Sequence, residues 1–418
     1  MTKPESAGFS AKRLETLERV MTRRYVDGGL LPGYQVQVWR RGALAHSATA
    51  GSMDLERGTA WRDDAIVRIY SMTKPITAVA LMMLVEEGAL ALDDAVHQYI
   101  PSWKNLRVYA SGLPSLTGET SGKFITTPCA RPMTVLDLAM HTSGLTYGFM
   151  SRTAVDAEYR RRNIGDLRTP GGLEGFVEQL AELPLDFSPG RYWNYSVSID
   201  VLGYLVQKLS GQTFGEFLRS RIFEPLKMHD TAFIVPAAKT ERFASCYMPK
   251  PGGGLKLQDD GGRSAYAETP KLEAGGGGLV STAQDYMRFC RMMLGGGTLD
   301  GVQILSPKTV AMFSANLLPG GKLLSDMVAG EGLFSEAGYS GVGFSLGCGV
   351  TVSTALSHLP GTAGEYFWGG AASTAFWIDP KEDLAVVFMT QVLGSDARLT
   401  LRRDLRTLVY SAMTQSNG

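Results

Sequence analysis

Ser71-Met72-Thr73-Lys74-Pro75 is the stretch that decides how this chain folds and where its chemistry lies. Ala65 to Tyr70, before it, has the pattern of a short strand or buried extended segment, and Ile76 to Val85, after it, that of a buried helix. Pro75 is tolerated in the first turn of a helix, where its missing N–H has no partner to lose. The sequence therefore predicts Ser71 at or just before a helix N-terminus, with Lys74 about one turn further on the same face.

A serine followed by a lysine at a helix start suits nucleophilic catalysis. The Ser71 hydroxyl is inert on its own and needs a base within hydrogen-bond reach, which Lys74 can supply. Unpaired N–H groups and the positive end of the helix dipole favour an oxyanion at the same place. A chain of this length contains on the order of one Ser-x-x-Lys by chance, so the assignment depends on the other motifs.

The composition is that of an ordinary globular protein. Of 418 residues, 44% are hydrophobic and 20% charged, and the 41 basic and 41 acidic residues cancel, so neither a nucleic-acid nor a membrane partner is expected. Residues 1–21 are polar and lack the apolar stretch of a secretory signal, and the longest apolar run, residues 78–85, is too short to span a bilayer. Four scattered cysteines favour reduced thiols in a cytoplasmic protein: Cys129, Cys246, Cys290 and Cys348.

Neither the histidines nor the glycine tract indicates a bound metal or phosphate. The five histidines form no H-x-x-x-H pair and lie far apart in sequence, so no metal and no other cofactor is expected. The tract Gly275-Gly276-Gly277-Gly278 lacks the Gly-Lys-Ser/Thr ending of a phosphate loop. Close backbone packing near a site is the favoured interpretation of this tract, with a linker as the alternative.

Strand patterns occur at both ends of the chain, with helices between them. The expected elements are a helix over residues 11–26, a hairpin over 33–50, mostly helices over 76–230, strands over 341–352, 373–379 and 384–390, and a closing helix over 396–413. This order predicts an α/β (α+β) fold in which both termini build one antiparallel sheet flanked by helices. Residues 1–75 and 274–418 would form this discontinuous domain and residues 76–273 a mainly helical one, with the active site between them.

Three sets of residues resemble the motifs of the serine β-lactamase and penicillin-recognising family. They are Tyr70-Ser71-Met72-Thr73-Lys74, then Thr134-Val135-Leu136-Asp137-Leu138 with His141-Thr142-Ser143-Gly144-Leu145, and Ser188-Pro189-Gly190-x-x-Trp193-x-Tyr195-Ser196. They span most of the chain in the family's order. The resemblance implies the β-lactamase-like fold and puts the family's catalytic tyrosine on Tyr195, which would take the Ser71 proton and relay it. A tyrosine that caps the core beside Pro189 is the structural alternative.

Two departures from the β-lactamase pattern favour ester substrates. Val197 stands where the tyrosine motif of β-lactamases ends in Asn, and the Lys-Thr-Gly motif is absent. The C-terminal strand region has Trp368-Gly369-Gly370 instead, which resembles the pattern of family VIII carboxylesterases. Trp368 would offer the substrate apolar area where a lysine would hold a carboxylate, and Gly369 and Gly370 would let the substrate lie close to the strand, although an ordinary core tryptophan is the alternative.

The resemblance also implies an oxyanion hole formed by the backbone N–H groups of Ser71 and Ala371. From their position after the His141 motif, Tyr147 and Phe149 are expected in the pocket wall. Gly343-Phe344-Ser345-Leu346-Gly347 matches the nucleophile elbow of α/β-hydrolases, but no acid lies between Ser345 and the only later histidine, His358. The elbow interpretation of Ser345 is therefore rejected.

The predicted function is a cofactor-free serine esterase that cleaves small, uncharged short-chain esters through an acyl-enzyme on Ser71. Hydrolysis of β-lactams and acyl transfer to an alcohol other than water remain alternatives because they share the acyl-enzyme chemistry. A non-catalytic binding module is disfavoured by the intact Ser71, Lys74 and Tyr195. A peptidase acting on D-amino-acid termini is disfavoured by the absence of a signal peptide pattern.

Overall fold

A computed structural model describes residues 3–113, 123–168, 170–329, 340–395 and 397–417. Its centre is one eight-stranded antiparallel sheet in the order β12-β13-β14-β15-β16-β1-β2-β3. The strands are β1 (Gly33–Arg40), β2 (Ala43–Asp54), β3 (Thr59–Ala60), β12 (Val342–Phe344), β13 (Gly349–Thr351), β14 (Tyr366–Gly369), β15 (Ala375–Asp379) and β16 (Leu384–Met389). Because β1 pairs with β16, the prediction that both chain ends build one sheet is confirmed.

The hairpin β1–β2 follows from its turn and its side chains. Arg41 and Gly42 both have positive φ, 50° and 75°, which is the geometry of a two-residue turn that matches the twist of a hairpin. On β1 the side chains of Val36 and Val38 are fully buried, and Tyr34 stacks on Phe388 of β16 with ring centroids 5.5 Å apart. These cross-strand contacts fix the register between the two termini.

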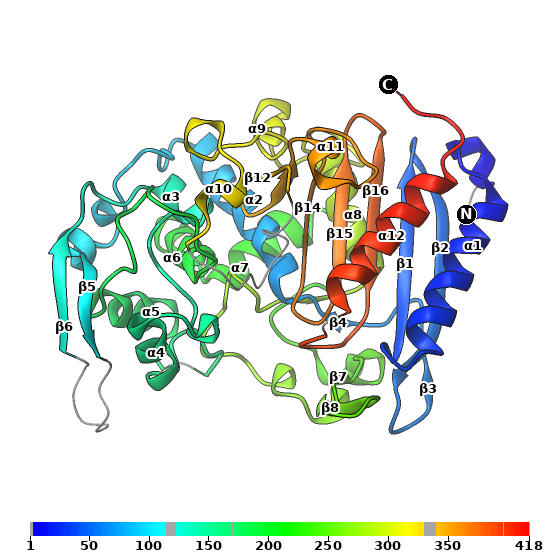
Figure 1. The fold of residues 1–418 in the computed structure, drawn as a ribbon, viewed down its shortest axis with the longest axis horizontal. Helices are drawn as coiled ribbons and strands as arrows, with labels where there is room; N and C mark the ends of the chain where they lie inside the picture. The colour runs from blue at the N-terminus through cyan, green and yellow to red at the C-terminus, as the bar shows by residue number, and fades with distance from the viewer. Residues whose placement is uncertain (1–2, 114–122, 169, 330–339, 396, 418) are drawn as a thin grey trace.

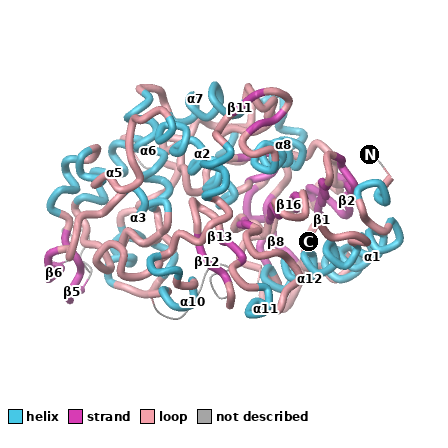
Figure 2. Tube along the Cα trace, turned by 90° about the horizontal axis from the view of Figure 1, so that it is seen from above, coloured by secondary structure: helices cyan, strands magenta, loops and turns pink. Residues whose placement is uncertain are grey.

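Helices cover both faces of the sheet. α1 (Ala11–Met21) and α12 (Arg398–Ala412) lie side by side on one face, and α8 (Ala283–Leu294) lies on the other (Figures 1 and 2). The helix expected over residues 11–26 is α-helical only to Met21, and residues 22–26 continue it as one wider π-helical turn. Within the described ranges, no helix combines the length and apolar character that crossing a bilayer requires.

A second group of helices lies beside the sheet. It comprises α2 (Thr73–Glu86), α3 (Val135–Ala139), α4 (Ala154–Arg161), α5 (Gly172–Ala181), α6 (Ser198–Ser210) and α7 (Phe214–Leu218). Every residue of α2 from Thr73 to Leu84 is buried, and Figure 1 shows this helix running from the sheet into the helical group. The hairpin of β5 (Arg107–Leu113) and β6 (Lys123–Pro128) interrupts the stretch that was expected to be mostly helical.

The chain returns to the sheet side before the glycine tract. β9 (Val280–Ser281) pairs with β4 (Val67–Arg68), just before Ser71. Upstream of that, Phe243 forms a bridge with Ile66, and the hairpin of β7 (Cys246–Pro249) and β8 (Leu255–Asp259) follows. Phe243 and the hairpin that follows it are therefore bound to the segment that leads into Ser71. The helical domain was predicted to extend to residue 273, which lies after these residues.

The remaining elements are short. They are β10 (Thr298–Leu299), β11 (Val302–Gln303), α9 (Pro307–Met312), α10 (Leu324–Met327) and α11 (Thr354–Ser357). The single alternating strand expected over residues 341–352 is instead the hairpin β12–β13, because Gly347 adopts a φ of +70° and turns the chain. The predicted strands over 373–379 and 384–390 form as β15 and β16, and the closing helix forms as α12.

Candidate active site

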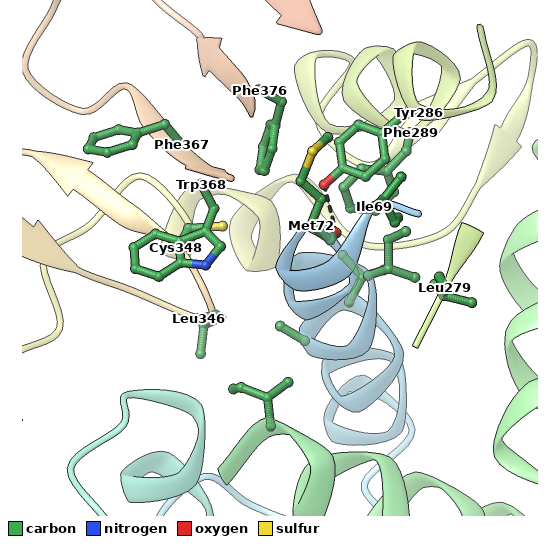
Figure 3. Close-up of a cluster of buried hydrophobic side chains, with 14 of the residues drawn as sticks. Ile69, Met72, Leu279, Tyr286, Phe289, Leu346, Cys348, Phe367, Trp368 and Phe376 are labelled. Carbon is green, nitrogen blue, oxygen red and sulfur yellow. Dashed lines mark hydrogen bonds between the residues drawn. The ribbon is translucent and has the colours of Figure 1, made fainter. Parts of the chain in front are cut away.

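Ser71 lies at the start of α2, as predicted from the sequence. It is the middle residue of a 3-10 turn (Tyr70–Met72) that leads into the helix, and Tyr70 has a left-handed φ of 42°. The Tyr286 hydroxyl on α8 donates a hydrogen bond of 2.9 Å to the Met72 carbonyl, within an apolar cluster that also holds Ile69 (Figure 3). The packed core behind the turn thus holds a strained backbone in a fixed position.

Lys74 and Tyr195 both reach the Ser71 hydroxyl. Lys74 Nζ lies 3.2 Å from Ser71 Oγ, and Tyr195 Oη lies 2.6 Å from the same atom. Lys74 Nζ also lies 4.5 Å from the centroid of the Tyr195 ring. The side chains of Lys74 and Tyr195 are buried, with exposed fractions of 0% and 3%, whereas Ser71 is half-buried. The three residues that were predicted as catalytic, separated by up to 124 positions, therefore converge on one oxygen.

The loop that carries Tyr195 is tied to the loop after α3. The Asn194 N–H donates to the carbonyl of His141 at 2.9 Å, and the Val197 N–H donates to the carbonyl of Thr146 at 3.3 Å. The His141 ring lies 4.9 Å from the Tyr195 ring, which fixes the phenol from behind. Val197 is fully buried, so the position that differs from the β-lactamase pattern is occupied here by a core side chain.

The glycine tract supplies a backbone partner for Lys74. Lys74 Nζ donates a hydrogen bond of 2.6 Å to the Gly276 carbonyl, and Thr77 Oγ1 donates one of 2.7 Å to the Gly275 carbonyl. A Cβ at Gly276 would lie only 2.5 Å from Asp200 Oδ2 and 2.7 Å from Tyr147 Oη. Close backbone packing beside the site, which the sequence favoured for this tract, is what the structure contains.

Asp200 on α6 is a site residue that the sequence did not indicate. Its side chain is 4% exposed, and its carboxylate accepts hydrogen bonds from the Gly276 N–H at 2.8 Å and from Tyr147 Oη at 3.4 Å. Burial raises the pKa of Asp200, and the nearby Lys74 ammonium partly offsets this. Asp200 thus holds the N–H of Gly276, the residue whose carbonyl accepts the hydrogen bond from Lys74. The available signal in the sequence was an acidic residue five positions after Tyr195, within the largely apolar helix pattern of residues 198–209.

A tight turn brings Ala371 into the same cleft as Ser71. The Gly370 N–H donates to the Thr374 carbonyl at 3.0 Å, and Ser373 adopts a φ of +70°. A Cβ at Gly370 would lie 2.4 Å from the carbonyl oxygen of Ile69, so only glycine lets this turn pack against the backbone that leads into Ser71. Ala371 and Ser71 line the same cleft.

That cleft has a volume of about 420 Å³ and lies between the sheet and the helical group. The side chains of Tyr147 and Phe149, expected in the wall, line it and stack with ring centroids 4.7 Å apart. The remaining described lining residues are Tyr70, Ser71, Gly165, Leu167, Tyr195, Asp200, Tyr266, Ala274, Gly276, Gly277 and Ala371. Aromatic and small residues dominate this wall.

Trp368 lies behind Tyr195 rather than on the cleft wall. Its side chain is 2% exposed, and its indole N–H points to Tyr195 Oη at 3.4 Å. Figure 3 shows the ring among Leu346, Cys348 and neighbouring core side chains. Neither Trp368 nor Gly369 and Gly370 is among the described residues that line the cleft. The strand register of β14, paired with β15, turns this indole into the core, where its N–H supports the phenol oxygen instead.

Ser345 is not a nucleophile elbow. It lies in the β12–β13 turn, is fully buried, and donates a hydrogen bond of 2.6 Å to the Met312 carbonyl. An elbow requires a strand-to-helix turn with an exposed hydroxyl, so the rejection of this motif is confirmed by its context.

The sheet, the inserted helices and the Ser–Lys–Tyr cluster define the β-lactamase-like class of serine enzymes. The Beta-lactamase family model matches residues 19–411, and the chain belongs to this family. Protein Rv1367c of Mycobacterium tuberculosis is 34% identical over 372 residues, which cover 88% of each chain. Esterase EstB of Burkholderia gladioli is 29% identical over 426 residues, covering 97% of this chain and 96% of EstB.

The fold is also found among solved structures. That of EstCE1, described as a hydrolase with promiscuous acyltransferase activity, superposes with a TM-score of 0.77 at 23% identity. The match covers 96% of this chain and 99% of EstCE1. The predicted β-lactamase-like fold is therefore confirmed.

Proposed function

We propose that this protein is a serine carboxylesterase of the family VIII type that hydrolyses small, uncharged short-chain esters through an acyl-enzyme on Ser71. The observation that carries the proposal is the position of Ser71 Oγ, 2.6 Å from Tyr195 Oη and 3.2 Å from Lys74 Nζ, at the edge of a mainly aromatic cleft. This arrangement provides a nucleophile, a base and a place for a carbonyl.

In the proposed reaction Ser71 Oγ attacks the ester carbonyl carbon while its proton passes to Tyr195 Oη. Tyr195 acts in this step as a phenolate, with the Lys74 side chain beside its ring. The N–H groups of Ser71 and Ala371 bind the oxyanion. As the intermediate collapses, the C–O bond to the alcohol breaks and Tyr195 returns the proton to the leaving oxygen. Water activated by the same pair then releases the acid.

The preference for uncharged esters is supported by the cleft wall. Its described lining consists of aromatic, aliphatic and small residues together with the Asp200 carboxyl. A substrate carboxylate, such as that of a β-lactam, would meet this acid rather than a positive side chain, and like charges at close range are unfavourable. A short acyl chain would instead pack against Tyr147 and Phe149.

Acyl transfer to an alcohol is the second candidate, supported by the shape of the cleft. A larger chamber of about 840 Å³ adjoins it and shares four lining residues: Tyr70, Gly165, Leu167 and Tyr266. A bulky alcohol seated there would lie next to an acyl-enzyme on Ser71 and compete with water. EstCE1, with the same fold, is described as having promiscuous acyltransferase activity.

A chain-length panel of p-nitrophenyl esters tests the proposed substrate class. We expect the highest kcat/KM at acetate or butyrate, a loss of about 100-fold at laurate, and a kcat/KM for the cephalosporin nitrocefin at least about 100-fold below that for butyrate. The measurement is initial rates on wild-type protein, repeated with an added alcohol acceptor to detect ester formation. A higher kcat/KM for nitrocefin than for every ester would overturn the proposal.

Asp200→Asn is expected to lower kcat about tenfold, because it weakens the hydrogen bond that holds Gly276, the residue whose carbonyl binds Lys74. The raised pKa of Asp200 also predicts a pH effect. As the pH falls through this pKa, the wild-type protein loses the carboxylate facing Lys74, so its activity declines at a higher pH than an ordinary aspartate would cause. In Asp200→Asn this decline of activity at acidic pH should be absent. Profiles of kcat against pH that are superimposable after scaling would contradict the role of Asp200.

A further inference from the structure

We propose that Arg402 is a positioning residue for the oxyanion hole. Its guanidinium holds the peptide unit between Gly370 and Ala371 so that the Ala371 N–H faces the carbonyl attacked by Ser71. This inference rests on the proposed esterase function and names a residue that acts on the site from the opposite side of the turn.

The contacts of Arg402 are directed at the relevant peptide. Arg402 lies on α12, and its Nη2 donates hydrogen bonds to the carbonyls of Gly370 at 3.1 Å and Thr374 at 2.7 Å. The Gly370 carbonyl and the Ala371 N–H belong to one planar trans peptide, in which C=O and N–H point in opposite directions. Fixing the oxygen on the Arg402 side therefore directs the N–H toward the cleft.

The two glycines make room for this arrangement. A Cβ at Gly369 would lie 2.1 Å from Arg402 Nη2, and a Cβ at Gly370 would lie 2.4 Å from the Ile69 carbonyl. The guanidinium and the backbone before Ser71 thus fill the two sides of the Gly369-Gly370 pair. These glycines were predicted to let the substrate approach the strand, and in the structure Arg402 and Ile69 also pack against them.

The positive charge of Arg402 would also strengthen the oxyanion hole. A cation at the Gly370 carbonyl polarises the peptide and strengthens the Ala371 N–H as a donor. Burial lowers the pKa of Arg402, whereas the negative charge that Tyr195 carries when ionised raises it. Negative charge at the oxyanion would therefore be stabilised from this side.

The test compares three variants with wild type: Arg402→Met, Arg402→Lys and, as matched control, Arg403→Met, which changes the exposed neighbour on the same helix. Each is assayed for p-nitrophenyl butyrate hydrolysis and for inhibition by 1,1,1-trifluoropentan-2-one. Ser71 Oγ adds to the carbonyl carbon of this ketone, its proton passes to Tyr195, and the ketone oxygen becomes an oxyanion in the hole. The corresponding trifluoropentanol cannot form this adduct and reports ordinary cleft binding.

We expect Arg402→Met to weaken inhibition by the ketone about tenfold or more and to lower kcat by a similar factor, with KM and the affinity of the alcohol changed less than about twofold. Arg402→Lys should recover part of both losses because it keeps a cationic donor, and Arg403→Met should behave as wild type. If Arg402→Met does not fold, the comparison of Arg402→Lys with wild type on the ketone and the alcohol decides.

Two outcomes would overturn the role of Arg402. One is a fall in kcat with unchanged ketone affinity. The other is an equal loss of ketone and alcohol affinity with no recovery in Arg402→Lys, which indicates a structural role only. Failure of the proposed function is separate from both, because it is detected as an absence of Ser71-dependent ester hydrolysis in the wild-type protein.

Discussion

Ser71→Ala is expected to lower kcat for p-nitrophenyl butyrate by about 10⁴-fold or more. Without Oγ no acyl-enzyme can form, and only the residual effect of binding and the oxyanion donors remains. The fold should be unaffected because the Ser71 side chain is half-buried and its neighbours Lys74 and Tyr195 keep the contacts that do not involve it. The measurement is the steady-state rate together with covalent labelling by a fluorophosphonate, followed by mass spectrometry.

Ser345→Ala is the matched control, since Ser345 is the serine of the other hydrolase-like motif. It removes the buried hydrogen bond from Ser345 Oγ to the Met312 carbonyl, at a cost of about 1 kcal/mol in the free energy of unfolding, and should leave kcat within a few-fold of wild type. Labelling is expected in wild type and Ser345→Ala and absent in Ser71→Ala. Loss of labelling in Ser345→Ala with retention in Ser71→Ala would reverse the assignment of the nucleophile.

The position of Ser71 could be predicted because it depends on residues next to it in sequence. Pro75 and the apolar run that follows it are local signals for the start of a helix. Ser71 and Lys74 could therefore be placed about one turn apart without knowledge of the tertiary structure. The pairing of β1 with β16 followed similarly from strand patterns at both ends and one hairpin signal between β15 and β16. Tyr195 lies in a loop, and only its motif indicated that it belongs to the site.

The groups that support these side chains could not be predicted, for physical reasons. Lys74 is held by the carbonyl of Gly276, and a backbone oxygen has no side-chain signature in sequence. Arg402 acts through contacts with Gly370 and Thr374, 28 to 32 residues away, which depend on how α12 packs on the sheet. A single arginine in an amphipathic helix is usually a solvent-facing residue, so its sequence context gave no hint.

The orientation of Trp368 could not be predicted from the sequence either. All four residues of β14 are buried, so the strand has no alternation of polar and apolar residues to show which face meets the cleft. The indole faces the core and places its N–H near the Tyr195 oxygen. Trp368, which was predicted to face the substrate, therefore contacts the Tyr195 oxygen from within the core.

Tyr195→Phe is expected to lower kcat by about 10² to 10⁴-fold, with a loss that depends on the leaving group. In the proposed mechanism Tyr195 Oη both removes the Ser71 proton and returns it to the alcohol oxygen. Phenylalanine keeps the ring beside Lys74 but lacks that oxygen. An alkyl ester such as ethyl butyrate needs a proton on its leaving oxygen, whereas p-nitrophenolate leaves without one. The variant should therefore lose at least about tenfold more activity on ethyl butyrate than on p-nitrophenyl butyrate.

The control is Tyr192→Phe, three residues earlier in the same loop, where the side chain is 37% exposed and packs edge-on against Phe187. Both of its activities should stay within about twofold of wild type, because surface substitutions of this kind change stability by about 0.5 kcal/mol or less. An equal loss on the two esters in Tyr195→Phe would show that the hydroxyl does not protonate the leaving group, and Lys74, whose Nζ lies 3.2 Å from Ser71 Oγ, would then have to carry that step. Unchanged activity in Tyr195→Phe would remove Tyr195 from the mechanism altogether, since no other change in this variant could compensate for the lost oxygen.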